Sequence, residues 1–278
     1  MLAPRALILR APGTNCDHET AHAFERAGAI ARRVHVRAFA EKPSIADDFQ
    51  ILCIPGGFSY GDDIASGRIF AMKLRERLFP SLKRALDRGV PMIGACNGFQ
   101  TLVQVGLLPG GDAGSDAPEQ VVALSDNTSG RFVDRWVGVT YERSRCVWTR
   151  GLADAFTQHA SDVQQLPVAH GEGRFVARDA GILDALERAG QVVLRYNDNF
   201  NGSERAIAGI CDASGLVFGL MPHPERYLSW QNHPYWTRLP ADVKRGDTPG
   251  LMMFKNAVSH VLSRGASTAR VPGTPVMA

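Results

Sequence analysis

The sequence predicts an α/β protein with a mainly parallel β-sheet and helices on both of its faces. Two observations lead to this fold class. Short apolar segments alternate with longer segments of helical periodicity through the first 105 residues. The short segments are apolar at nearly every position, which is typical of parallel strands buried on both faces. A chain of 278 residues is also long enough to bury a full hydrophobic core.

The N-terminal half supplies most of this alternation. The segment 69–87 places Phe70, Leu74 and further apolar residues four positions apart, as one face of a helix does. Pro80 lies inside that segment, so we expect a break or kink there, because proline cannot donate a helical hydrogen bond. The other elements expected here are strands over 6–9, 31–36, 51–54 and 91–95, a helix over 17–27, and a helix after the last strand that runs to residue 105.

The C-terminal half is richer in strands, which either extend the sheet or form a small accessory one. Thr248 is expected to cap a last helix that ends near Leu262. Residues 1–264 are expected to form a single domain, with a C-terminal extension from about residue 228, and the Pro-rich residues 265–278 to be a disordered tail. An exposed loop is expected over 110–118, and strands over 131–139, 145–148, 165–169, 192–196, 206–211 and 216–220.

Composition excludes several classes of protein. The formal net charge is +3 and no basic run occurs, so no nucleic-acid partner is expected. No apolar segment approaches the roughly 20 residues of a membrane span. The five cysteines are widely spaced with no CxxC pair, which is not the pattern of a disulfide framework. We therefore expect a reducing compartment, the cytoplasm.

The segment Gly94-Ala95-Cys96-Asn97-Gly98, between an expected strand and helix, predicts a nucleophile elbow with cysteine as the nucleophile. The glycines fit a sharp turn, because side chains two residues before and after the nucleophile would collide with neighbouring segments. The start of the following helix favours a thiolate and offers free N–H groups to an oxyanion. The alternative is a buried structural cysteine beside a tight turn.

The segment 221–226, Met-Pro-His-Pro-Glu-Arg, supplies a base for this thiol. In an extended segment, side chains two positions apart point the same way, so Glu225 is expected on the side of His223. A carboxylate in that place fixes the imidazole tautomer and stabilises the imidazolium. Alone, this pattern also fits a loop histidine in a surface ion pair.

Three strings carry a family resemblance: GACNGFQ at 94–100, PVAHGEGRF at 167–175 and MPHPER at 221–226. Shorter matching stretches include 13–17, 55–62 and 201–203. With them the chain resembles the class I, triad-type glutamine amidotransferases from about residue 5 to 227, most closely the PurQ-type glutaminase subunits of phosphoribosylformylglycinamidine synthase. The resemblance implies a three-layer α/β fold. It also marks the roughly fifty residues after the last string as a departure from the family pattern, since such subunits usually end soon after that string.

The resemblance assigns roles to individual residues. Cys96 becomes the nucleophile, His223 the general acid/base and Glu225 the residue that orients it. The backbone N–H groups of Gly57 and Asn97 would form the oxyanion hole.

Two side chains are expected to bind substrate. Gln100 lies one helical turn beyond Cys96 and would contact glutamine. His170 is a candidate for holding the amino-acid end of the substrate, with a structural loop role as the alternative.

The implied reaction is hydrolysis of glutamine to glutamate and ammonia without a metal or organic cofactor. Ammonia would pass to a PurL-type synthetase subunit that uses ATP and magnesium in purine synthesis, with a small PurS-type subunit as a further partner.

Other functions remain open from the sequence. His18-Glu19-Thr20-Ala21-His22 matches the H-E-x-x-H pattern of zinc hydrolases, although such a short pattern also arises by chance on a solvated helix. A non-catalytic binding protein with the same fold, or a plain cysteine hydrolase with the same elbow, would also fit parts of the pattern.

Overall fold

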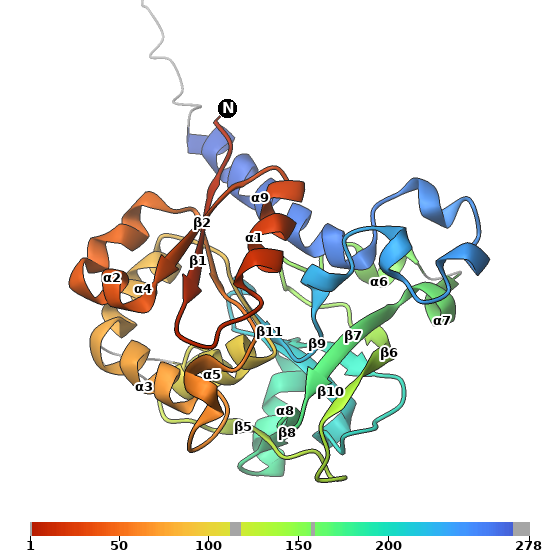
Figure 1. Cartoon of the computed structure of the whole chain (residues 1–278), viewed down its shortest axis with the longest axis horizontal. Coiled ribbons are helices and arrows are strands. Elements are labelled where there is room, and N and C mark those ends of the chain that lie inside the picture. The colour runs from red at the N-terminus through yellow and green to blue at the C-terminus, as the bar shows by residue number, and fades with distance from the viewer. Residues whose placement is uncertain (1, 112–117, 157–158, 269–278) are drawn as a thin grey trace, which may run out of the picture.

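In the computed structural model, which describes residues 2–111, 118–156 and 159–268, a nine-stranded sheet forms the centre of the chain (Figure 1). The strand order is β2-β1-β3-β4-β11-β10-β9-β6-β7, and β5 pairs with β8 in a separate two-stranded sheet. The bounds are β1 Arg5–Arg10, β2 Ile30–His35, β3 Ile51–Ile54, β4 Met92–Ala95, β5 Val122–Ser125, β6 Val133–Tyr141, β7 Gln165–His170, β8 Arg174–Ala177, β9 Val192–Tyr196, β10 Ile207–Cys211 and β11 Val217–Leu220.

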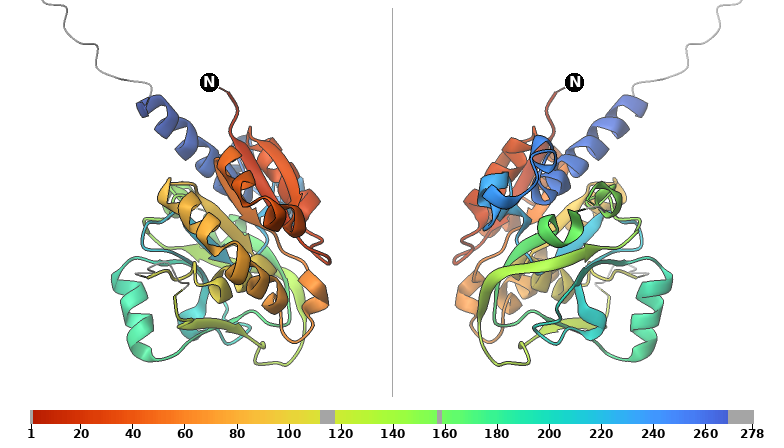
Figure 2. Two further views of the ribbon diagram at one scale, coloured as in Figure 1. Left: turned by 90° about the vertical axis from the view of Figure 1, so that its left-hand side faces the viewer. Right: turned by 90° about the vertical axis from the view of Figure 1, so that its right-hand side faces the viewer.

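Helices cover the parallel part of the sheet in two layers (Figure 2). Helix α5 contacts β3, β4 and β11, and α3 packs on α5. Helices α1 and α9 contact each other, and they lie on β1 and β3, where Phe24 and Phe254 meet edge to face at 5.0 Å. The bounds are α1 Asp17–Arg26, α2 Val36–Glu41, α3 Arg68–Arg77, α4 Phe79–Asp87, α5 Asn97–Val105, α6 Leu152–Ala155, α7 Ala160–Val163, α8 Ala180–Arg188 and α9 Pro249–Thr268.

The expected α/β class with helices on both faces is confirmed, but the sheet is mixed. Strands β2, β1, β3, β4 and β11 are parallel, as expected. Strands β10, β9, β6 and β7 join them in antiparallel pairs. The link between β10 and β11 spans only 212–216, and so short a connection permits an antiparallel hairpin but no parallel crossover.

Several boundaries differ from expectation. The helical segment breaks at Leu78, two residues before Pro80, which lies in the first turn of α4. No strand forms over 145–148, where a bend and a turn occur instead. Thr248 caps α9 through its hydroxyl and the N–H of Leu251, but the helix continues to Thr268. Residues 112–117 of the expected loop and residues 269–278 of the expected tail lie outside the described residues.

Sheet topology determines where a site can form. The chain runs from β1 outward to β2 and then returns to β3 on the other side of β1. Crevices at the carboxyl ends of parallel strands beside such a reversal are the usual ligand sites of open α/β sheets. The loops after β1, β3, β4 and β11 all leave from this edge. Within the described residues, no helix has the length and apolar character needed to span a membrane.

Candidate active site

Cys96 stands alone between β4 and α5, at the sharp turn predicted from the sequence. Its backbone adopts φ 51° and ψ −111°, a conformation that non-glycine residues rarely take. Its N–H donates to the carbonyl of Leu220 in β11 at 2.8 Å, which holds the turn against the neighbouring strand. Strained backbone of this kind persists where the surroundings determine it, and it concentrates at functional sites.

The glycines around Cys96 are needed for close packing, as the sequence indicated. A Cβ on Gly94 would lie 2.5 Å from the carbonyl oxygen of Gly98 and 2.6 Å from a methyl carbon of Leu102. Gly98 in turn packs directly on the backbone at the end of β3. Any larger residue at either position would push α5 away from the sheet and move the thiol with it.

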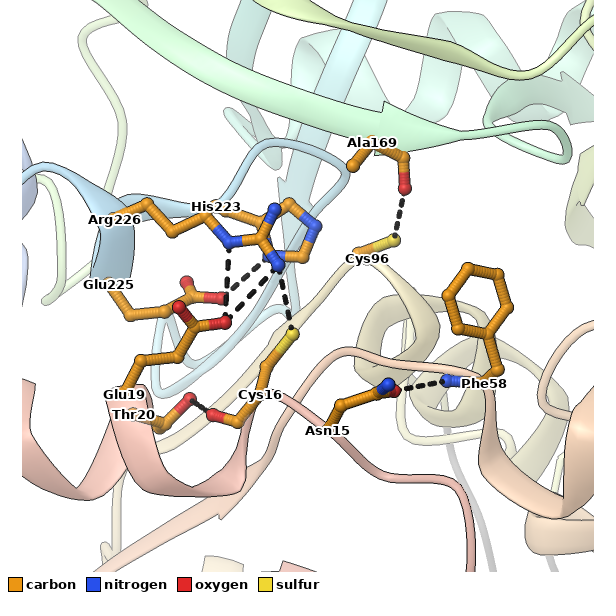
Figure 3. A network of polar contacts seen from close by, with 10 residues as sticks. All are labelled: Asn15, Cys16, Glu19, Thr20, Phe58, Cys96, Ala169, His223, Glu225 and Arg226. Atoms are coloured by element: carbon orange, nitrogen blue, oxygen red, sulfur yellow. Dashed lines mark hydrogen bonds and ion pairs between the residues drawn. The ribbon is translucent and has the colours of Figure 1, made fainter.

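The Cys96 thiol is nearly covered but faces a cavity. It is 6% exposed, and Sγ donates weakly to the carbonyl oxygen of Ala169 at the end of β7, at 3.6 Å (Figure 3). The thiol also lies at the N-terminus of α5, a helix of nine residues whose first N–H groups lack helical partners. Those groups and the helix dipole favour negative charge at this end.

His223 and Glu225 form a buried pair after β11. Nδ1 of His223 lies 2.6 Å from Oε1 of Glu225, and the two residues are 1% and 3% exposed. The N–H of His223 donates to the carbonyl of Pro167 at 2.8 Å, which fixes the backbone of the loop. Burial opposes an imidazolium, but the Glu225 carboxylate, assisted by the thiols of Cys96 and Cys16, holds the pKa of His223 well above its usual value.

The pairing was expected from the sequence, but its backbone basis was wrong. Residues Pro224–Arg226 form a short 3₁₀ turn and not an extended segment. The N–H of Arg226 donates to the carbonyl of His223 at 3.2 Å, and this turn brings the Glu225 carboxylate back to the imidazole. Proline starts such a turn readily because its φ is already suitable.

Gly57 and Asn97, the residues expected to form an oxyanion hole, lie in the loop after β3 and at the start of α5. Gly57 has φ +126°, and a Cβ there would lie 2.5 Å from the backbone nitrogen of Asn15. Asn97 opens α5, and its side chain accepts a hydrogen bond from the Ser59 hydroxyl at 2.5 Å and donates to Asp62 at 2.9 Å. The Gly-rich loop after β3 is therefore fastened to the first residue of the nucleophile helix.

A cavity of about 190 Å³ opens over Cys96, large enough for a small amino acid. Gln100 and His170 both line it, as expected for substrate-binding residues. The side-chain amide of Gln100 donates to the carbonyl of Glu172, so it is held toward the cavity. The remaining lining comes from Gly57, Phe58, Asp62, Ser66, Phe132, Ala169, Gly171 and Glu172.

His170 is held as a neutral ring. Its Nδ1 lies 3.1 Å from the side-chain oxygen of Asn127, and Nε2 is buried without a hydrogen-bond partner in the described part of the chain. Burial, with a smaller contribution from the nearby His223, lowers the pKa of His170 to about 4. At neutral pH the ring carries no charge, so His170 lines the cavity as a neutral group.

Sequence reasoning missed an acidic group in this cavity. Oε2 of Glu172 accepts from the N–H of Ser66 at 3.2 Å, and Asp62 accepts from the Ser66 hydroxyl at 3.0 Å. Burial raises the pKa of Asp62. Glu172 was within reach of sequence analysis, because it follows His170 by two positions in the string PVAHGEGRF.

The residues of the H-E-x-x-H pattern do not come together as a metal site. They lie on α1 as expected, but Glu19 binds the guanidinium of Arg226 at 3.2 Å and His18 contacts Arg33. Among the described residues, the group of side chains whose potential ligand atoms lie close together is Cys16, His223 and Glu225, beside the nucleophile.

Comparison with known proteins identifies the family of this chain. Residues 3–261 match the CobB/CobQ-like glutamine amidotransferase domain. The chain is 41% identical over 261 residues to phosphoribosylformylglycinamidine synthase subunit PurQ of Dehalococcoides mccartyi, covering 91% of this chain and 96% of the relative. It is 39% identical to the PurQ subunit of Methanococcus maripaludis, covering 93% and 98%.

A solved structure agrees with these relatives. A chain of PurLQS from Thermotoga maritima superposes with a TM-score of 0.68 at 33% identity, covering 93% of this chain and 99% of that one. The domain match runs to residue 261, so residues 228–261, which were expected to depart from the family, are shared with it. The chain belongs to the glutamine amidotransferases, in the family of PurQ subunits of phosphoribosylformylglycinamidine synthase.

Proposed function

We propose that Cys96, His223 and Glu225 are the triad with which this glutaminase subunit hydrolyses glutamine. The observation that carries this proposal is the buried His223–Glu225 pair, which follows β11 at the point where that strand pairs with Ala95, next to the strained turn of Cys96. The chain thereby acts as the ammonia-producing subunit of a phosphoribosylformylglycinamidine synthase in purine biosynthesis.

The reaction follows from the placement of these groups. His223 takes the proton of the Cys96 thiol, and the thiolate attacks the side-chain amide carbon of glutamine. Glu225 holds Nδ1, so the proton is carried on Nε2, and it stabilises the imidazolium. The imidazolium then protonates the departing nitrogen, which leaves as ammonia. Water, deprotonated by His223, cleaves the glutamyl thioester to release glutamate and the thiol.

The oxyanion formed in both steps is bound by backbone donors. The N–H of Asn97, at the start of α5, and that of Gly57, in the loop after β3, are the proposed pair. The cavity contact of Gly57 and the helix position of Asn97 support this role. Loss of one such donor typically costs about 10²–10³ in rate.

Gln100, His170 and Glu172 are proposed to bind the amino-acid end of glutamine. Their supporting observation is that all three line the 190 Å³ cavity beside Cys96. The Glu172 carboxylate suits the α-ammonium group, and the Gln100 amide suits a carboxylate or carbonyl oxygen. No cofactor is assigned to this half-reaction.

The ammonia is used by a partner. We assign a PurL-type synthetase subunit, which consumes ATP with magnesium, and a small PurS-type subunit as a further component, working in the cytoplasm. A supporting observation is the rim of the cavity, where Phe58 and Phe132 stack with ring centroids 6.2 Å apart while 47% and 54% exposed. Exposed apolar groups gathered around a site are typical of a surface that another protein covers.

The test is the Cys96→Ala variant assembled with the synthetase subunits. Glutamine-dependent synthesis is expected to be abolished, while synthesis from added ammonia continues at the wild-type rate. Loss of both activities would mean that Cys96 supports assembly and not chemistry, and retention of both would exclude it as the nucleophile.

A further inference from the structure

A second buried thiol, that of Cys16, lies beside the imidazole of the triad (Figure 3). Cys16 immediately precedes α1 and is 2% exposed. Its N–H donates to the carbonyl of Gly56 at 3.3 Å, and its carbonyl accepts from the N–H and the hydroxyl of Thr20 at 3.0 and 2.6 Å. The thiol is thus fixed from both the loop after β3 and the first turn of α1.

An arginine from the catalytic turn binds this thiol. Nη2 of Arg226 lies 3.4 Å from Sγ of Cys16. Nε and Nη2 of Arg226 both lie 3.2 Å from Oε1 of Glu19, which is on the first turn of α1. Residues more than 200 positions apart therefore form a closed link between α1 and the turn that carries His223 and Glu225.

The link reaches the imidazole itself. Sγ of Cys16, a ring nitrogen of His223 and a carboxylate oxygen of Glu225 lie within 4.8 Å of one another. A Cβ on Gly56 would lie 2.8 Å from Cε1 of His223 and 3.3 Å from Sγ of Cys16, so the Gly56 backbone touches both groups. Nδ1 of His223 is held by Glu225, whereas Nε2 is buried without a hydrogen-bond partner among the described residues.

The ring is therefore contacted from two directions. Glu225 orients Nδ1, and Gly56 and the Cys16 thiol lie against the ring as well. Burial raises the pKa of Cys16 although its contact with His223 opposes this, so the group is a neutral thiol and no second nucleophile. The Arg226 charge nearby is offset by Glu19, so it does not oppose an imidazolium.

We propose that Cys16 is a positioning residue for glutamine hydrolysis: with Arg226 and Glu19, it holds the His223 imidazole in line with the Cys96 thiol. This inference rests on the proposed function of the triad. A thiol suits the position because it is small enough to be buried against the ring, neutral, and able to accept from a guanidinium.

The experiment compares Cys16→Ala and Cys16→Ser with wild type in the assembled complex. Cys16→Ala is expected to lower kcat for glutamine about tenfold, with an almost unchanged KM, because the imidazole loses its support. The limb of the pH–rate profile governed by His223 shifts to lower pH, since a contact that raises its pKa is removed. Cys16→Ser, which still accepts from Arg226, restores part of both effects.

The matched control is Cys146→Ala, which removes an equally buried thiol beside Cys211. Ammonia-dependent synthesis reports assembly in every variant. Should Cys16→Ala fail to fold, Glu19→Gln, which breaks the link from the helix side, is expected to lower kcat and shift the pH limb in the same direction. Glu25→Gln, at an exposed position of the same helix, is its control.

The inference is overturned if Cys16→Ala has the same kcat and the same pH–rate profile as Cys146→Ala. Where Cys16→Ala does not fold, the same result for Glu19→Gln against Glu25→Gln overturns it. It is also overturned if purified wild-type protein holds stoichiometric zinc that the Cys16→Ala variant loses, because the thiol would then be a metal ligand. Absence of glutamine hydrolysis by the wild-type complex would instead overturn the proposed function itself.

Discussion

A Cβ on Gly98 would lie 1.8 Å from the carbonyl oxygen of Ile54, so the nucleophile helix meets the end of β3 through bare backbone. Ile54 is the last residue of β3, and the Gly-rich loop that supplies Gly57 begins just after it. The distance between the nucleophile and this loop is therefore set by the absence of one side chain. A methyl group added at Gly98 would therefore push the nucleophile helix and this loop apart.

Gly98→Ala is accordingly expected to affect both stability and rate. We expect a loss of about 3 kcal/mol in the free energy of unfolding from overpacking. Folded variant should retain roughly a hundredth of the glutaminase rate, because an ångström of displacement at the thiol is enough for such a loss. Denaturant unfolding and steady-state kinetics measure the two effects. Gly246→Ala, at a position with nothing closer than 4.0 Å, is the control and should be nearly silent.

Glu225→Gln tests the charge at the triad histidine. The amide occupies the same space as the carboxylate but cannot stabilise an imidazolium, so kcat is expected to fall by roughly 10²- to 10⁴-fold. The pKa of His223 should fall as well, because the Glu225 carboxylate is the largest of the groups that raise it. The kcat/KM profile against pH records both changes. A variant with wild-type kcat would exclude Glu225 from the triad.

His170 makes stability depend on pH. Its pKa is about 4 in the folded chain and 6.5 as a free group. As the pH falls, the ring is therefore protonated in the unfolded state before it is protonated in the folded state. The stabilising contribution of the neutral ring is complete above about pH 6.5 and is lost as the pH falls toward 4. Between pH 7 and 5 the loss is about 2 kcal/mol. His170→Gln should unfold with a pH dependence weaker by that amount, and an unchanged slope would show that His170 does not titrate this way.

Phe132→Ser tests the aromatic rim. Removal of one exposed ring should leave the melting temperature of the isolated chain almost unchanged but raise the Kd for the synthetase subunit about tenfold or more. Ile30 on the edge strand β2 is equally exposed, at 54%, and Ile30→Ser is the control. Calorimetry measures the Kd of each variant for the synthetase subunit. If the two values were the same, the aromatic rim would not be a partner surface.

The parts of the site that local sequence encodes could be predicted. Strands β3 and β9 have the expected bounds, and the turn at Cys96 follows because glycines on either side of it are required by close backbone contacts. The pattern failed over 145–148, where the apolar residues are buried by a turn and not by a strand. There, Nε1 of Trp148 donates to the carbonyl of Leu216 and the N–H of Val147 to that of Gly215, both at 2.9 Å.

Other parts depend on contacts that no local pattern contains. Cys16 and Arg226 meet across 210 positions, so the sequence showed only a cysteine near a helix start. The short link 212–216 implies the antiparallel β10–β11 hairpin, whereas the place of β9 between β10 and β6 depends on pairing between strands that are distant in the sequence. Helix α8 was missed although a local signal was present, since Asp179 caps it by accepting from the N–H of Ile182 at 3.1 Å.

The C-terminal helix bears directly on the catalytic turn. The hydroxyl of Thr248 donates to the carbonyl of Tyr227, and a Cβ on Gly250 would lie 2.4 Å from the carbonyl oxygens of both Pro224 and Tyr227. The start of α9 therefore packs against the turn that carries Glu225, although it follows that turn in the chain. During synthesis on the ribosome, every recognisable motif of the active site emerges before α9 does, so the turn that carries Glu225 can reach its final packing only after α9 has been made.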